Sequence, residues 1–139
     1  MKKVVLLFLI NIIVFASQAD VEFKIYTTII NSLFPNKNIV YVWCDSNDLN
    51  FLDKSQKIVI IPDIKKADIL IISHQLSQPE IDKIIFTRDY KLLKKYKENA
   101  VGGFYWQKGR PNILFLKRNL QKFHLELPKT FKDYIEDEF

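Results

Sequence analysis

Apolar residues recur along this chain in two patterns, one typical of helices and one typical of buried strands. Between residues 21 and 34 they recur every three or four positions, which is the spacing of one helix face. Asp20 is the predicted N-cap of this helix, and Pro35 ends it. A shorter stretch, residues 90–96, has leucines and a tyrosine on one side and lysines on the other. Both segments are therefore predicted to be amphipathic helices.

Short continuous apolar runs predict strands that are covered on both faces. These runs are residues 39–43, 58–61, 69–72 and 84–86. Runs of this kind fit a parallel or mixed sheet with helices on either side. The polar segment 45–52 is predicted to form a turn followed by one helical turn, and Pro79-Glu80 is predicted to begin a short helix.

The last third of the chain predicts a β-hairpin. Two apolar runs, 101–106 and 112–116, flank a five-residue link, 107–111, that contains Gly and Pro. Residues 119–123 are predicted to form a short helix, and Pro128 is predicted to begin a final helix that runs to about Glu138. The order of elements predicts an α/β fold: one compact domain, with a mixed sheet, helices on both faces and a C-terminal β-hairpin.

Residues 1–19 have the pattern of a secretory signal peptide. Two lysines precede an apolar run, residues 4–15, and Ser17-Gln18-Ala19 offers a small-residue cleavage site. The run is shorter than the roughly 20 residues that a transmembrane helix needs. We expect cleavage to leave residues 20–139 as a single periplasmic domain, and an uncleaved membrane anchor is the alternative.

Composition and charge narrow the classes of function. The net charge falls from +5 to +3 without the two leader lysines, which is too small an excess to indicate nucleic acid as a partner. The single cysteine, Cys44, excludes an intramolecular disulfide and is expected to pack at the end of a strand, with an intermolecular disulfide or a redox role as alternatives. His74 and His124 have no neighbouring ligands, so no metal or cofactor is expected. The absence of a nucleophile elbow, a phosphate loop or a paired-histidine motif argues against an enzyme.

Thr87, Arg88 and Asp89 join a predicted strand to a predicted helix and are the candidate ligand-binding residues. Helix N-termini attract anions, and Arg88 would add charge and hydrogen-bond donors, so a carboxylate or phosphate is the candidate ligand. The alternative is an ordinary helix cap beside a solvated arginine. Asp45 and Asp48 follow another strand, where they either contact a ligand at the sheet edge or cap a turn.

The hairpin supplies the candidate partner-binding residues, Tyr105, Trp106, Lys108 and Arg110. Alternate side chains of a strand face opposite ways, so Tyr105 must point away from Phe104 and Trp106. One side of the hairpin is therefore expected to carry a large aromatic ring toward solvent or another surface, beside the two basic residues. Aromatic residues with arginine are favoured at protein interfaces. Core packing is the alternative role of these rings.

The order of these features resembles that of the YfiR-like family of small periplasmic proteins. A helix that ends at Leu33-Phe34-Pro35, a strand and acidic turn over 39–48, and Thr87-Arg88-Asp89 followed by Gly102-Gly103 carry the resemblance. It implies an exported protein without an active site that binds the extracytoplasmic sensor domain of an inner-membrane receptor or diguanylate cyclase. Several members of that family have cysteine pairs, whereas Cys44 stands alone here. A small solute-binding module for an anionic ligand is the alternative function.

Overall fold

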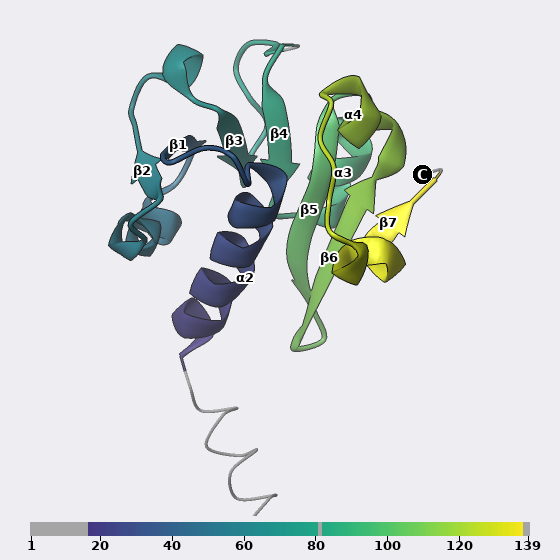
Figure 1. Cartoon of the computed structure of the whole chain (residues 1–139), viewed down its shortest axis with the longest axis horizontal. Helices are drawn as coiled ribbons and strands as arrows, with labels where there is room; N and C mark the ends of the chain where they lie inside the picture. The colour runs from purple at the N-terminus through teal and green to yellow at the C-terminus, as the bar shows by residue number, and fades with distance from the viewer. Residues whose placement is uncertain (1–16, 81, 138–139) are drawn as a thin grey trace, which may run out of the picture.

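The computed structural model describes residues 17–80 and 82–137 (Figure 1). The α-helices of this part of the chain are α2 (Gln18–Leu33), α3 (Tyr90–Lys95) and α4 (Lys117–Lys122). Its strands are β1 (Val40–Cys44), β2 (Ile58–Ile60), β3 (Ile69–Ile72), β4 (Ile84–Thr87), β5 (Ala100–Gln107), β6 (Arg110–Leu116) and β7 (Ile135–Glu136). Its 3-10 helices are η1 (Asn47–Lys54), η2 (Ile64–Lys66) and η3 (Lys129–Tyr134).

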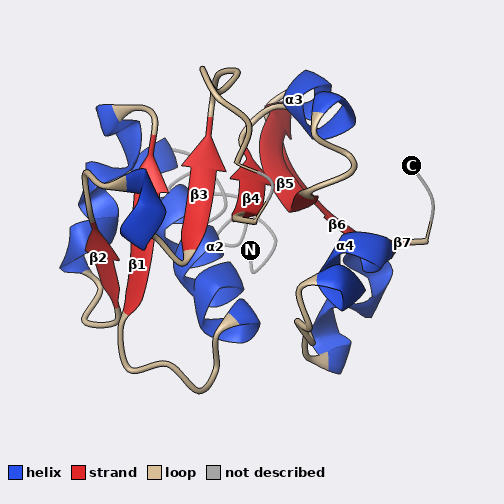
Figure 2. Cartoon of the chain, turned by 90° about the horizontal axis from the view of Figure 1, so that it is seen from above, coloured by secondary structure: helices blue, strands red, loops and turns tan. Residues whose placement is uncertain are grey.

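The seven strands form one mixed sheet in the order β2-β1-β3-β4-β5-β6-β7. Strands β1 to β5 run parallel, β6 is antiparallel to β5, and β7 is parallel to β6. Helix α2 lies against one face of the sheet and α3 against the other (Figures 1 and 2). The predicted fold class is thus confirmed: a single compact α/β domain with helices around a mixed sheet and a hairpin near its C-terminal end.

The two faces of the sheet bury two apolar cores. On the α2 face, the helix stripe predicted from sequence is buried, and the Tyr26 ring packs edge-on against Phe86 and Phe104, with centroids 6.1 and 5.3 Å away. On the α3 face, Leu92 and Leu93 pack with apolar side chains of β3, β4 and β5. Burial on both faces explains why the central strands are continuous apolar runs in the sequence.

Helix α2 begins earlier than predicted. Its N-cap is Ser17, whose Oγ accepts a hydrogen bond from the Asp20 N–H at 3.2 Å, so the prediction of Asp20 as the cap is wrong. The rest of the predicted signal peptide, residues 1–16, lies outside the described residues. Among the residues that are described, no helix is both long enough and apolar enough to cross a membrane.

The hairpin has a tighter turn than the predicted five-residue link. Strands β5 and β6 pair as far as Gln107 and Arg110, which leaves only Lys108 and Gly109 between them. Both turn residues have positive φ, 51° and 74°, as a type I′ turn requires. A two-residue turn of this type continues the right-handed twist of its strands, so the ladder extends to the tip.

Two further segments correct the sequence predictions. A helix begins after Pro128 as predicted, but it is the 3-10 helix η3 and ends at Tyr134 instead of about Glu138, because Ile135 of β7 pairs with Phe115 of β6. The short helix predicted near Pro79 is wrong for the described residues there. These form a turn closed by a bond from the Lys83 N–H to the Glu80 carbonyl at 3.2 Å. The helix predicted over 119–123 is present as α4.

Candidate functional site

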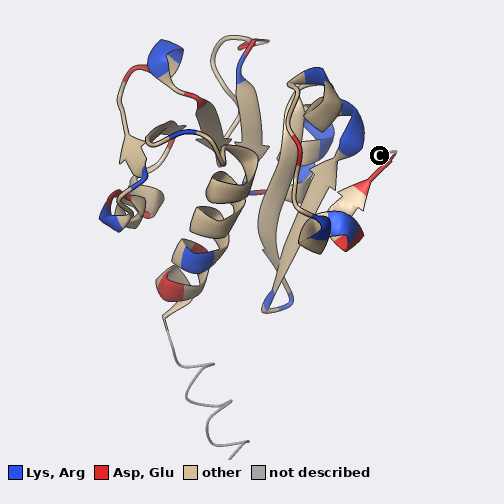
Figure 3. Cartoon of the chain, in the orientation of Figure 1, with Lys and Arg blue, Asp and Glu red and all other residues tan. Residues whose placement is uncertain are grey.

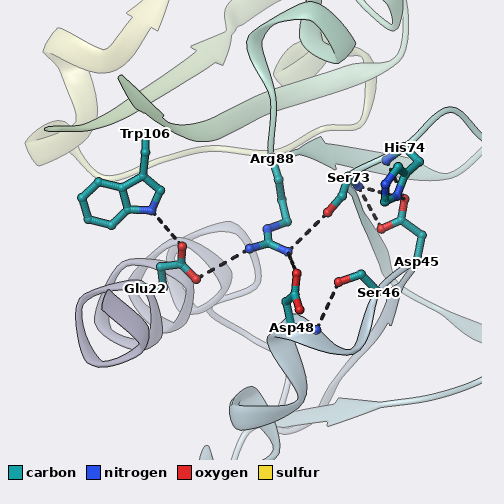
Figure 4. A network of polar contacts seen from close by, with 8 residues as sticks. All are labelled: Glu22, Asp45, Ser46, Asp48, Ser73, His74, Arg88 and Trp106. Carbon is teal, nitrogen blue, oxygen red and sulfur yellow. Dashed lines mark hydrogen bonds and ion pairs between the residues drawn. The ribbon is translucent and has the colours of Figure 1, made fainter. Parts of the chain in front are cut away.

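The chain segments that follow β1, β3 and β4 meet at the carboxyl edge of the sheet. These strands are parallel neighbours, so Asp45, Ser73 and Arg88, the first residue after each, lie together (Figure 4). The chain order also reverses at β1, which is flanked by β2 and β3. In open α/β sheets, ligands bind outside the carboxyl ends of the strands at such a reversal.

Arg88 is the centre of a polar network at this edge. Its Nη2 lies 3.7 Å from Glu22 Oε2, its Nη1 lies 3.7 Å from Asp48 Oδ2, and Nη1 also donates a 3.3 Å hydrogen bond to Ser73 Oγ. The Arg88 and Glu22 side chains are only 17% and 11% exposed, whereas that of Asp48 is 77% exposed. Arg88 and Glu22 therefore form an inner ion pair that solvent screens weakly, and Asp48 adds an outer contact.

Glu22 links this network to the hairpin. Its Oε1 accepts a 2.8 Å hydrogen bond from Nε1 of Trp106 in β5. Glu22 lies on the buried stripe of α2, one turn before Tyr26. A carboxylate at that depth is stable only with partners, and Arg88 and Trp106 supply them. We name Glu22, Asp48, Ser73, Arg88 and Trp106 the Arg88 network.

Asp45 holds two strand ends together beside this network. Its carboxylate accepts hydrogen bonds from the backbone N–H groups of Ser73, at 2.9 Å, and of His74, at 2.7 Å. The exposed imidazole of His74 lies 3.6 Å away, measured from Nδ1. Asp45 therefore has a structural role, because it joins the end of β1 to the end of β3. Asp48 instead forms an ion pair with Arg88.

Two groups near the network are kept neutral by burial. Burial raises the pKa of the Cys44 thiol from 9.0 to about 12, against the opposing charge of Arg88. Burial likewise raises the pKa of the Tyr26 hydroxyl, against the opposing effect of Arg88. A thiol with a raised pKa is a poor nucleophile at neutral pH. Cys44 packs against the α2-side core, as its position after a strand predicted.

The three predicted ligand-binding residues do not form a pocket together. Thr87 is fully buried and its Oγ1 donates to the Asp89 carbonyl at 3.3 Å, so no ligand can reach it. Asp89 caps α3 by accepting a hydrogen bond from the Lys91 N–H. Arg88 alone faces the carboxyl edge, where two carboxylates already oppose its single charge. An anion added there would meet net negative charge.

The four predicted partner-binding residues divide between the two sides of the hairpin. Tyr105 and Trp106 point opposite ways, as alternation requires, and Trp106 contacts Glu22, so it belongs to the Arg88 network. Tyr105 lies on the other side, with its ring centroid 5.5 Å from that of Tyr90. Lys108 in the turn and Arg110 beside it are exposed, and basic residues mark the hairpin tip in Figure 3.

Sequence reasoning missed Glu22, Ser73 and Tyr90. Glu22 had a usable signal, because a carboxylate stood on the apolar stripe of a predicted helix and needed a buried partner. Ser73 and Tyr90 had no such signal, since their neighbours come from strands that are distant in the sequence.

No protein-family model matches the chain, and the comparison with curated proteins finds no relative. The resemblance to the YfiR-like family therefore rests on the order of sequence features, and membership of that family stays a proposal. Function is argued below from the Arg88 network and the hairpin.

Proposed function

We propose that this chain is an exported, non-catalytic regulatory protein of the YfiR-like type. It docks on the extracytoplasmic sensor domain of an inner-membrane receptor or diguanylate cyclase and shifts the signalling equilibrium of that partner. The apolar leader pattern of residues 1–19 supports export to the periplasm. A ligand shifts such an equilibrium only if it binds one state of the receptor more tightly than the other.

The observation that carries this proposal is the anchoring of the hairpin by the Arg88 network. The Trp106 side of the hairpin is held by Glu22, which is in turn paired with Arg88. The opposite side presents Tyr105, and the tip presents Lys108 and Arg110. A rigid element with an aromatic and basic surface loses little conformational entropy when it binds a protein.

The polar groups at the carboxyl edge favour binding over catalysis. The Ser73 hydroxyl accepts a hydrogen bond from Arg88, and the Asp45 carboxylate is occupied by two backbone N–H groups. The Cys44 thiol, with its pKa raised to about 12 by burial, stays protonated at neutral pH. A nucleophile is activated by an adjacent base or a lowered pKa, whereas burial raises the pKa of Cys44.

The alternative function, binding of a small anionic solute, receives less support. It required Thr87, Arg88 and Asp45 to face one ligand, but Thr87 is buried and Asp45 accepts backbone hydrogen bonds. Glu22 and Asp48 also outnumber the single charge of Arg88. Regulation of a protein partner is therefore the better-supported function.

The test is capture of the partner followed by reconstitution. The full chain, tagged at its C-terminus, is crosslinked in the cells that produce it and purified from their membranes. We expect enrichment of a membrane receptor or cyclase with an extracytoplasmic domain, and saturable binding of the isolated domain to the purified chain. An unrelated exported protein with the same tag is the control. Failure to enrich any such membrane protein over this control would contradict the proposal.

A further inference from the structure

One side of the hairpin faces a groove that borders the Arg88 network, because Arg88 and Trp106 are among its lining residues. Residue Gly103 of β5 pairs with Thr87, the last residue of β4, so residues 104–107 extend past the end of the neighbouring strand. The extension forms one wall of a groove of about 680 Å³, and residues 88–90 form the other. Alternation along β5 places Tyr105 and Gln107 on the same side.

The groove has an aromatic floor. The rings of Tyr90 and Tyr105 lie 5.5 Å apart with an interplanar angle of 56°, and Tyr90 is 40% exposed. The Tyr105 hydroxyl is protonated at neutral pH and can donate a hydrogen bond. Tyrosine combines a large apolar contact with a polar tip, which makes it a frequent anchor at protein interfaces.

The rim of the groove is basic. Arg110 is the cross-strand partner of Gln107 and therefore shares the Tyr105 side of the hairpin. Lys94 lies over the Tyr90 ring, with Nζ 5.3 Å from its centroid. Lys108 stands at the exposed turn, and the one acidic lining residue, Asp89, is used to cap α3. The charges around the rings thus complement a negative partner.

We propose that this groove binds an acidic segment of a protein, with an apolar side chain on the two tyrosine rings and carboxylates at Lys94 and Arg110. The inference rests on the proposed function, because it names the chemistry of the partner segment that docks at the hairpin. Rim charges of this kind act mainly on the association rate and on selectivity between partners. The segment should therefore bind less tightly as salt is added.

The test uses the full chain and a fluorescein-labelled probe peptide, Gly-Glu-Asp-Phe-Glu-Asp-Gly, at low salt. Fluorescence anisotropy should show saturable binding that a peptide with Lys in place of Glu and Asp lacks. The double variant Lys94→Glu with Arg110→Glu should bind the probe at least about tenfold more weakly. Tyr105→Ala should also weaken binding, through loss of the apolar contact. Circular dichroism confirms that each variant is folded.

A matched control distinguishes the groove from general charge. Lys66 is an exposed lysine of η2, a turn that lies at the opposite end of the sheet from the hairpin tip (Figure 1). Lys66→Glu should leave probe binding unchanged. Absence of saturable binding, or an equal loss in Lys66→Glu and the double variant, would overturn the inference.

Three further outcomes distinguish this inference from an anionic membrane as occupant and from the proposed function. Phosphatidylglycerol vesicles should not displace the probe, and displacement by the vesicles would identify an anionic membrane as the occupant and overturn the inference. If the probe fails to bind while a receptor domain is still captured and bound, the groove is not the docking site and the proposed function stands. If no receptor domain is captured but the probe binds in the groove, the inference survives for a different protein partner.

Discussion

The indole N–H of Trp106 donates a 2.8 Å hydrogen bond to Glu22, which lies 84 positions earlier in the chain. The second oxygen of the same carboxylate lies 3.7 Å from Nη2 of Arg88. A single buried carboxylate therefore joins helix α2, the end of β4 and the hairpin (Figure 4). Residues 104–107 extend past the end of β4, so pairing with the parallel strands does not hold them in place. The contact between Trp106 and Glu22 therefore fixes this extension.

A double-mutant cycle should measure this contact. Glu22→Ala leaves Arg88 and Trp106 without their inner partner, and Trp106→Phe removes only the N–H donor. We expect each single change to lower the free energy of unfolding by about 1 to 3 kcal/mol. The double variant should lose less than the sum, because both changes remove the same bond. Urea denaturation measures all four proteins, and Glu126→Ala, at an exposed carboxylate, is the control. Strictly additive losses would show that Glu22 and Trp106 do not interact.

Two of the three hairpin glycines, Gly102 and Gly109, should differ in their tolerance of a methyl group. A Cβ at Gly102 would overlap the Leu114 carbonyl oxygen and crowd Phe115, whereas a Cβ at Gly109 would meet no atom within 4 Å. Gly102→Ala should therefore cost about 1 to 3 kcal/mol of stability through overpacking. Gly109→Ala should cost less, about 1 kcal/mol, because an L-residue is strained at its positive φ of 74° but meets no neighbouring atom there. Thermal unfolding followed by circular dichroism ranks the two, and the reverse order would contradict the packing described here.

The alkaline stability of the chain should depend on Cys44. Burial raises the pKa of this thiol from 9.0 to about 12, so the unfolded state loses its proton at a lower pH than the folded state. This contribution to stability is present below about pH 9 and is lost as the pH rises toward 12. Cys44→Ala should therefore show a smaller decline in free energy of unfolding between about pH 8.5 and pH 10.5. Tyr26, with its pKa also raised chiefly by burial, acts in the same direction in both proteins, and the small contribution of Cys44 to that shift adds to the expected difference.

Urea denaturation at several pH values makes the Cys44 comparison. Equal declines in the two proteins would mean that the thiol is not buried as described. Iodoacetamide offers an independent check, because it reacts with the thiolate. The folded chain should be alkylated more slowly than the chain unfolded in urea.

The spacing of apolar residues predicted the helices and strands whose formation depends mainly on residues close together in the chain. The helix stripe that includes Tyr26 and Leu33 is buried, and the run 69–72 is strand β3. The hairpin was predicted, but the Gly and Pro of its link suggested a longer loop. Arg110 and Pro111 instead join the ladder, because Lys108 accepts a left-handed conformation beside Gly109. Strand β7 escaped prediction, since two residues carry no periodicity and its pairing with β6 is non-local.

The candidate site was predicted only in part, for the same reason. Arg88 was identified, but its partners Glu22 and Asp48 come from α2 and η1, which tertiary packing brings to it. Thr87 was expected to meet a ligand, yet it packs against Gly103, where a Cβ would lie only 2.6 Å from its Oγ1. A close approach between two strands cannot be read from either segment alone.

The most direct test of the docking surface compares two tyrosines of equal exposure. Tyr90 lines the groove and is 40% exposed, whereas Tyr41 of β1 is 41% exposed and does not line it. Each position in turn is replaced by the photo-crosslinker p-benzoylphenylalanine in the full chain, which is then irradiated in the cells that produce it. We predict a crosslink to a membrane receptor or cyclase from position 90 and none from position 41. Equal crosslinking from both positions, or crosslinking from position 41 alone, would contradict docking through the groove.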